Sequence, residues 1–109
     1  MISDLQWDRS FALEQAGDDE ALLAELLAIL RQSAGDDLRR MKEAMHAGDG
    51  RALANAAHNT KGAAASLGME MLRRVASELE QVGRSGELAA AAAKLDTLEA
   101  MLGQLKAVK

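Results

Sequence analysis

Apolar residues recur along this chain with the spacing of an α-helix, in segments that glycines separate. The clearest stripe follows Asp18 and Asp19 and consists of leucines at helical spacing: Leu22, Leu23, Leu26, Leu27 and Leu30. The chain contains no proline, and its apolar content is mostly Ala, Leu and Met, which are strong helix formers. Aromatic and β-branched residues are few, which disfavours a sheet. The sequence therefore predicts an all-α fold.

Aspartate and glycine indicate where the predicted helices begin and end. Asp8 can cap a short helix over about 8–16, and Gly48-Asp49-Gly50 ends one long helix and starts the next. A helix over about 18–47 is expected to bend or break at Ser33-Ala34-Gly35. Gly83-Arg84-Ser85-Gly86 is interpreted as a turn. The remaining predicted helices span about 51–67, about 70–83, and the segment from this turn to near the C-terminus.

Four long helices with short connections favour an up-down antiparallel four-helix bundle. The bundle is expected over about residues 18–107, and the short helix over about 8–16 is an addition to it. We expect residues 1–109 to form one domain. In the last helix, a narrow apolar stripe predicts the bundle seam: Leu88, Ala91, Leu95, Leu98, Leu102 and Leu105.

Charge and composition exclude several classes of function. The net charge is -4, and no basic stripe is present, so we expect no nucleic-acid partner. Cysteine is absent, which excludes disulfides, thiolate metal sites and cysteine nucleophiles. The apolar runs are too short to cross a membrane, and no signal peptide is evident. We therefore expect a cytoplasmic protein without a membrane partner.

A helical wheel of segment 51–67 places a histidine away from the core. With Leu53 at zero, the expected core residues lie within roughly 40° of it: Leu53, Ala57, Thr60, Ala64 and Leu67. His58 falls at roughly 140°. The same outer face carries small or uncharged neighbours and is bordered by two cations: Ala54, Ala65, Gly62, Asn55, Arg51 and Lys61.

This outer face differs from an ordinary exposed helix surface, which carries Glu and Lys. A mid-helix glycine costs about 1 kcal/mol of helix stability relative to alanine, so Gly62 needs a reason. One reason is that the missing side chain leaves a partner room to reach the imidazole. An exposed imidazole is largely neutral and nucleophilic at neutral pH. If such an imidazole carried a phosphoryl group, Lys61, three residues later on the same helix surface, could contact one of its oxygens. His46 stands at a helix end, where a cation is favourable, and is interpreted as structural or neutral.

The stretch Ala57-His58-Asn59-Thr60-Lys61-Gly62, continued by AAASLG, resembles the signature of histidine-containing phosphotransfer (HPt) domains. The Leu79-Glu80 pair resembles the pair that follows in that family. The resemblance implies that His58 is phosphorylated through Nε2, that Lys61 assists the phosphoryl group and that Gly62 provides clearance. Arg51, Ala54, Asn55 and Ala65 would surround His58 as docking residues.

The resemblance also implies the partners. The chain would exchange phosphoryl groups with aspartates of receiver domains in a multistep phosphorelay of two-component signal transduction. A sensor histidine kinase is a further possible partner. The chain would have no kinase activity, no cofactor and no metal of its own, with Mg²⁺ held by the receiver, and we expect a monomer. Thr60 departs from the family, which usually has leucine there; its hydroxyl is expected to bond the i−4 carbonyl.

Two other interpretations stay open at this point. The chain could be a non-catalytic bundle that binds or inhibits a signalling partner, although the intact His58, Lys61 and Gly62 set disfavours this. A metal-binding bundle would need Glu-x-x-His pairs that face inward, and neither histidine belongs to such a pair. Whether the chain is a free protein or a piece of a hybrid kinase is also open.

Overall fold

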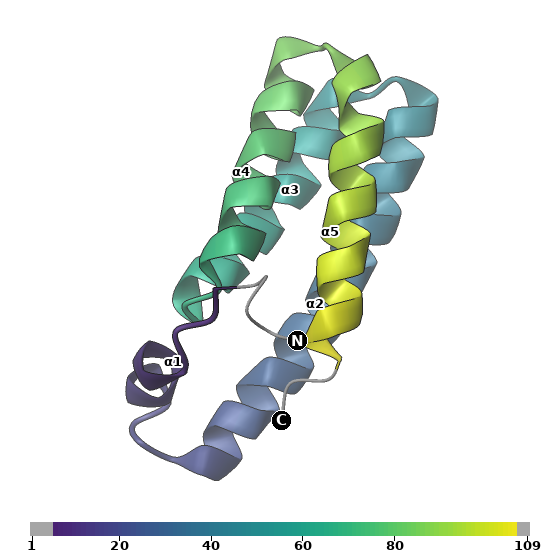
Figure 1. Ribbon diagram of the computed structural model, residues 1–109. Coiled ribbons are helices and arrows are strands. Elements are labelled where there is room, and N and C mark those ends of the chain that lie inside the picture. The colour runs from purple at the N-terminus through teal and green to yellow at the C-terminus, as the bar shows by residue number, and fades with distance from the viewer. Residues whose placement is uncertain (1–5, 107–109) are drawn as a thin grey trace.

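A computed structural model, which describes residues 6–106, shows a bundle of four long helices with a short helix at one end (Figure 1). The short helix is α1 (Arg9–Gln15). The bundle consists of α2 (Glu20–Ala47), α3 (Gly50–Ser66), α4 (Glu70–Ser85) and α5 (Ala91–Leu105). A 3₁₀ turn, η2 (Leu88–Ala90), precedes α5. No strand occurs among residues 6–106; Trp7 and Met69 form only an isolated bridge. The predicted all-α bundle with an extra N-terminal helix is confirmed.

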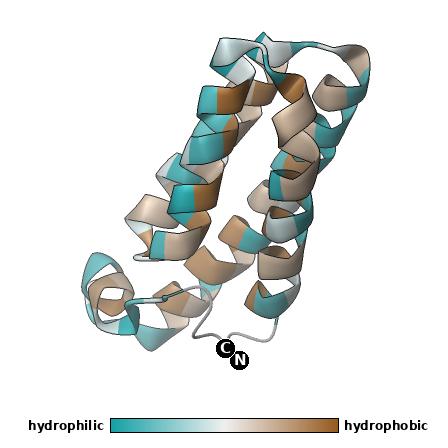
Figure 2. Ribbon diagram, turned by 45° about the horizontal axis from the view of Figure 1, so that its top comes forward, coloured by the Kyte–Doolittle hydropathy of each residue, from teal (hydrophilic) through white to brown (hydrophobic). Residues whose placement is uncertain are grey.

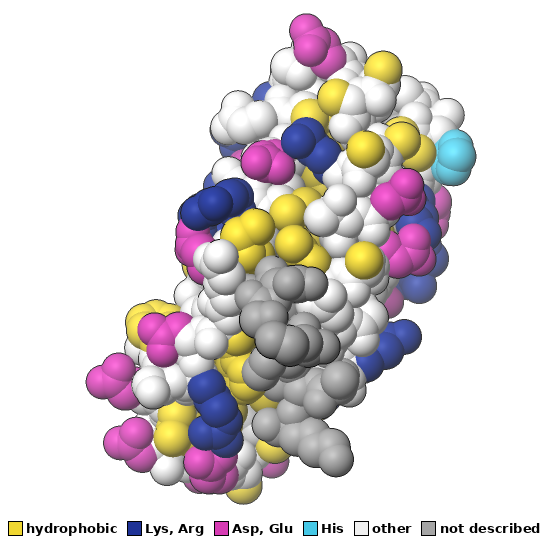
Figure 3. Space-filling view, in the orientation of Figure 1, with side chains coloured by type: hydrophobic (Ala, Val, Ile, Leu, Met, Phe, Trp, Pro, Cys, Tyr) yellow, Lys and Arg dark blue, Asp and Glu magenta, His cyan; other side chains and the backbone are white. Residues whose placement is uncertain are grey.

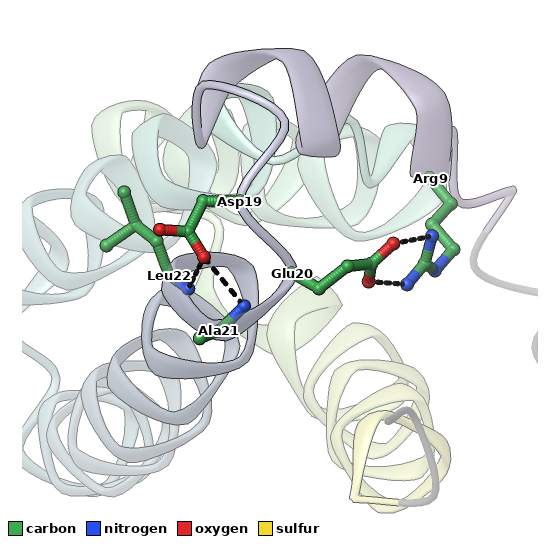
Figure 4. A network of polar contacts seen from close by, with 5 residues as sticks. All are labelled: Arg9, Asp19, Glu20, Ala21 and Leu22. Atoms are coloured by element: carbon green, nitrogen blue, oxygen red, sulfur yellow. Dashed lines mark hydrogen bonds and ion pairs between the residues drawn. The ribbon is translucent and has the colours of Figure 1, made fainter.

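Side chains next to the chain reversals explain where the helices start. Asp8 and Asp49 each accept a hydrogen bond from the backbone N–H three residues ahead. Asp19 caps α2 by accepting from the N–H groups of Ala21 and Leu22 at 2.9 and 3.1 Å, as Figure 4 shows. In the same figure, Glu20 at the start of α2 pairs with Arg9 of α1. The caps at Asp8 and Asp49 agree with the predicted capping positions.

Two boundaries settle questions that the sequence left open or answered wrongly. α2 is one continuous helix through Ser33-Ala34-Gly35, so it is not broken there. The predicted turn at Gly83-Arg84-Ser85-Gly86 is wrong for its first three residues, which belong to α4. The helix ends only at Gly86, which has a φ of 78°. Gly83 continues the helix because it lies buried against α3, where tertiary packing decides the local conformation.

The apolar faces of the helices point toward one another, as the hydropathy colouring in Figure 2 shows. Leu53, Leu72, Leu79 and Leu98 are fully buried in this core. Five of the six residues predicted for the seam of α5 are buried, and Leu88, in η2, is partly buried. None of the helices in the described part of the chain is long and apolar enough to span a membrane.

The N-terminal segment is attached to the turn between α3 and α4. The Trp7 indole N–H donates to the Leu67 carbonyl at 2.8 Å, and the Asp8 N–H donates to the Gly68 carbonyl at 2.9 Å. Gly68 has a φ of 71°, and a Cβ there would lie 2.9 Å from the Asp8 carbonyl oxygen. These contacts hold the C-terminal end of α3 in place.

Candidate functional site

His58 lies on the outer surface of α3, with 61% of its side chain exposed. Gly62, one turn further along α3, is exposed, and a Cβ built on it would meet no atom within 4 Å. The predicted exposure of His58 is therefore confirmed. The space next to the imidazole is open on the side where Gly62 stands, so a partner surface could approach the ring from there.

A buried carboxylate from α4 holds the other side of the imidazole. Glu80 is 1% exposed, and its Oε2 lies 3.0 Å from His58 Nδ1. Lys61 of α3 places Nζ 2.5 Å from Oε1 of the same carboxylate. Arg84, one turn after Glu80 in α4, donates from Nη2 to Oε2 at 2.5 Å. One buried anion thus joins three side chains that reach the surface.

The charges around Glu80 determine which nitrogen of His58 carries the proton. The Lys61 ammonium beside it lowers the pKa of the Glu80 carboxyl, and the His58 hydrogen bond and the Arg84 charge act in the same direction, against the effect of burial. Glu80 is therefore ionised at neutral pH and only accepts hydrogen bonds. His58 must then carry its proton on Nδ1, which leaves a lone pair on Nε2 in the neutral ring.

Most of the predicted docking residues surround His58 on the surface. Arg51, Asn55 and Ala65 are exposed. Ala54 is only 7% exposed, so its predicted place on the outer face is wrong. It packs against α4, where a Cβ on Gly83 would lie 2.7 Å from the Ala54 backbone nitrogen. The wheel could not show this, because it describes one helix and not its neighbour.

Thr60 is fully buried, as the wheel predicts. Its hydroxyl does not bond the i−4 carbonyl as expected; it donates to Oδ2 of Asp37 in α2 at 3.1 Å. Asp37 is 2% exposed and also accepts from Arg40 at 3.2 Å. The polar residue at this core position is thus matched by a buried carboxylate on the neighbouring helix.

Sequence reasoning missed the roles of two residues at this site. Glu80 entered only as part of the Leu79-Glu80 pair, and Arg84 was assigned to a turn. A signal for Glu80 was present, because it follows Leu72, Ala76 and Leu79 at helical spacing on the apolar stripe of α4. A charged residue on a buried stripe needs a partner. The sequence does not reveal that this partner is the histidine of another helix.

A partly apolar groove lies further along α3 from His58. It has a volume of about 320 Å³, and its lining includes Leu26 and Ile29 of α2 with Ala63 and Ser66 of α3. Ile29 is 63% exposed, and Phe11 and Leu22 are exposed by 37% and 39%. Figure 3 shows hydrophobic side chains at the surface in the lower part of the molecule, where α1 and the start of α2 lie. None of these α2 residues was among the predicted docking residues.

The structure thus presents an exposed histidine, held by a buried carboxylate, on the surface of a four-helix bundle. Comparison with known proteins gives the class of protein to which this arrangement belongs. The family model described as Hpt domain matches residues 25–108. The crystal structure of histidine-containing phosphotransfer protein B (HptB) from Pseudomonas aeruginosa PAO1 superimposes with a TM-score of 0.86. The two chains are 27% identical, and the match covers 94% of this chain and 89% of that one. No curated protein matches the chain.

The chain belongs to the Hpt domain family. It is accordingly a phosphotransfer protein of a phosphorelay and not a kinase. The Hpt family needs no cofactor of its own, and its members work with other phosphorelay proteins.

Proposed function

We propose that His58 accepts and donates the phosphoryl group through Nε2, and that the exchange partners are aspartates of receiver domains. The observation that carries this proposal is the hydrogen bond between His58 Nδ1 and the buried Glu80 carboxylate, made while most of the ring is exposed. The contact orients the ring and directs the proton to Nδ1. The unprotonated Nε2 is then the nucleophile available to an incoming phosphoryl group.

The transfer step follows from this proton arrangement. The Nε2 lone pair attacks the phosphorus of an aspartyl phosphate, the N–P bond forms, the P–O bond to the aspartate breaks, and the aspartate leaves as a carboxylate. The phosphorylated ring keeps its Nδ1 proton and becomes cationic. Glu80 stabilises that cation at 3.0 Å, and the same cationic ring is a good leaving group for the reverse transfer.

Lys61 and Gly62 support this step in different ways. Lys61 is 30% exposed and is paired with Glu80 in the unphosphorylated protein. Because it stands one turn from His58 on the same helix, it can turn to an oxygen of the new phosphoryl dianion. Gly62 leaves open the approach to the ring. Phosphoryl transfer depends mainly on positioning and charge neutralisation, so few further groups are required.

The surface around His58 supports docking of a receiver domain. The proposed contacts are Arg51, Asn55 and Ala65 around the histidine, with the groove at Ile29 as an apolar extension. The receiver would supply Mg²⁺ and the aspartate, and a sensor histidine kinase is a further candidate partner. We also propose, as the sequence predicts, that the chain acts in the cytoplasm, that it is a monomer and that it binds no nucleic acid.

The direct test is transfer from a receiver domain loaded with ³²P from acetyl phosphate in the presence of Mg²⁺. We expect the wild-type chain to accept label and His58→Gln to accept none. His46→Gln is the matched control and should accept label at the wild-type rate, because His46 stands at the C-terminal end of α2. The bound label should be acid-labile and alkali-stable, since an N–P bond hydrolyses when its nitrogen is protonated. Acceptance at the wild-type rate by His58→Gln would show that the assignment is wrong.

A further inference from the structure

Two glycines bring the backbones of α3 and α4 into direct contact. A Cβ on Gly83 would lie 2.6 Å from the Gly50 carbonyl oxygen and 2.7 Å from the Ala54 nitrogen. A Cβ on Gly50 would likewise overlap the Gly83 carbonyl oxygen. All three are backbone atoms, so no change of rotamer could relieve the overlap. A larger residue at either position requires the two helices to move apart.

This contact lies one turn from the carboxylate that holds His58. Gly83 follows Glu80 by three residues in α4, and Ala54 precedes His58 by four residues in α3. Glu80 spans from one helix to the other, with its oxygens 3.0 Å from His58 Nδ1 and 2.5 Å from Lys61 Nζ. The reach of this side chain therefore depends on how closely the two helices approach at the neighbouring turn.

We propose that Gly50 and Gly83 are positioning residues for phosphotransfer, because their contact sets the distance between α3 and α4 at which Glu80 reaches His58. The proposal rests on the function proposed for His58. Replacing 2.6 Å by an ordinary contact distance requires a separation of roughly 1 Å. A hydrogen bond of 3.0 Å lengthened by that amount is no longer a hydrogen bond. His58 would then lose the contact that keeps its proton on Nδ1.

The test compares Gly83→Ala with Gly35→Ala and Gly103→Ala. The control glycines also stand inside helices, but a Cβ on either would meet nothing within 4 Å. We expect Gly83→Ala to slow transfer from the ³²P-loaded receiver domain by about 10- to 100-fold, as a misplacement of about 1 Å can do. ¹⁵N NMR should show that His58 loses its preference for the Nδ1–H tautomer. The controls should keep the wild-type rate and tautomer.

Glu80→Asp provides a second variant if Gly83→Ala does not fold. It shortens the carboxylate arm by about 1.5 Å and leaves the helix contact untouched. The proposal predicts the same loss of tautomer preference and a similar loss of rate. A folded Gly83→Ala protein with wild-type tautomer and rate would overturn it, and so would wild-type behaviour of Glu80→Asp. His58→Gln in the same assay distinguishes failure of the function proposed for His58 from failure of the role proposed for the glycines. If His58→Gln accepts label, the proposed function is wrong, independently of the result for the glycine variants.

Discussion

Two buried carboxylates contact α3 from two different helices, and they differ in the side chains that they hold. Asp37 of α2 is 2% exposed and accepts from the Thr60 hydroxyl, which is itself fully buried. Glu80 of α4 is 1% exposed and contacts His58 and Lys61, which reach the surface. Both anions satisfy polar groups of one helix that stand close together in sequence. Only the second has a partner that is mostly exposed, because 61% of the His58 side chain is accessible to solvent.

The exposure of the partner side chain is what distinguishes a buried carboxylate that could support a functional site from one that only supports the core. Burial of a carboxylate is costly, and such contacts are weak evidence for stability by themselves. At Asp37 the hydrogen bonds close the polar group off inside the core. At Glu80 the same kind of contact holds a mostly exposed imidazole, and two cations, Lys61 and Arg84, stand beside the carboxylate. We therefore expect mutations at the two carboxylates to affect different measurements.

The largest effect on transfer among the following variants is expected for Glu80→Gln. The amide can donate to Nδ1, which would shift the His58 proton to Nε2 and remove the nucleophile. Partners that orient a metal-bound histidine are worth about 10- to 100-fold, and we expect a loss of that order for Glu80. Transfer rates from a loaded receiver domain measure this effect, with circular dichroism to confirm the helical fold. A transfer rate within twofold of wild type would mean that Glu80, like Asp37, supports the fold and has no role in transfer.

Gly62→Leu should close the site without disturbing its carboxylate. A helical side chain covers the turn that precedes it, so Leu at 62 would lean over His58. We expect a loss of at least about tenfold in transfer, because the phosphoryl donor must approach the ring in line. The unfolding free energy should rise by up to about 1 kcal/mol, since the space there is open and leucine favours a helix more than glycine. Unimpaired transfer in the folded variant would remove the clearance role of Gly62.

Lys61→Ala should slow transfer without abolishing it. One charge-assisted contact is worth roughly 1.5–3 kcal/mol, and the partial exposure of Lys61 places the loss near tenfold. Arg74→Ala is a suitable control, because Arg74 is an exposed cation of α4 that forms an ion pair with Glu70, outside the site. Equal rates for both variants in a single-turnover assay would argue against any role of Lys61 at the phosphoryl group.

Asp37→Ala should change stability and leave transfer within about twofold. It leaves the buried Thr60 hydroxyl without its acceptor, which costs about 1–3 kcal/mol of unfolding free energy. Urea unfolding measures this cost. In the double variant Asp37→Ala, Thr60→Val, part of the loss should return, because the unsatisfied hydroxyl is gone. A slowed transfer in stable Asp37→Ala protein would show that the two carboxylates are functionally coupled through α3.

The smallest expected effect is a change in the free energy of unfolding at acid pH, caused by protonation of Glu80. Its pKa in the folded protein lies below the ordinary value of 4.5, chiefly because of Lys61. The stabilising contribution is therefore fully present above about pH 4.5 and is lost as the pH falls through the folded pKa. The difference in unfolding free energy between wild type and Glu80→Gln should shrink below pH 4.5. A difference that stays constant down to pH 3 would contradict this ion-pair assignment.

The parts of the molecule that local interactions control were predictable. The capping carboxylates of Asp8, Asp19 and Asp49 bond N–H groups two or three residues away, so the helix starts depend on neighbouring sequence alone. The exposure of His58 follows from the helical period, because one face of α3 carries the core residues. The motif around His58 then points to its chemistry.

The parts that depend on a second helix were not predictable. Ala54 and Gly83 were assigned to an open face and a turn, yet they pack against each other inside the bundle. The Thr60 hydroxyl was expected to bond within α3, and its acceptor comes from α2. In each case a residue distant in sequence supplied the partner, and a wheel or a turn pattern contains no information about it.

The sequence by itself determined that this chain forms helices, where most of them start, and that His58 faces outward near Lys61 and Gly62. Only the tertiary structure decided that the buried Glu80 carboxylate lies 3.0 Å from Nδ1 of His58, the contact on which the proposed use of Nε2 rests. The physical reason is range. Capping and periodicity act within a few residues along one helix, whereas the position of a buried carboxylate depends on how closely α3 and α4 pack.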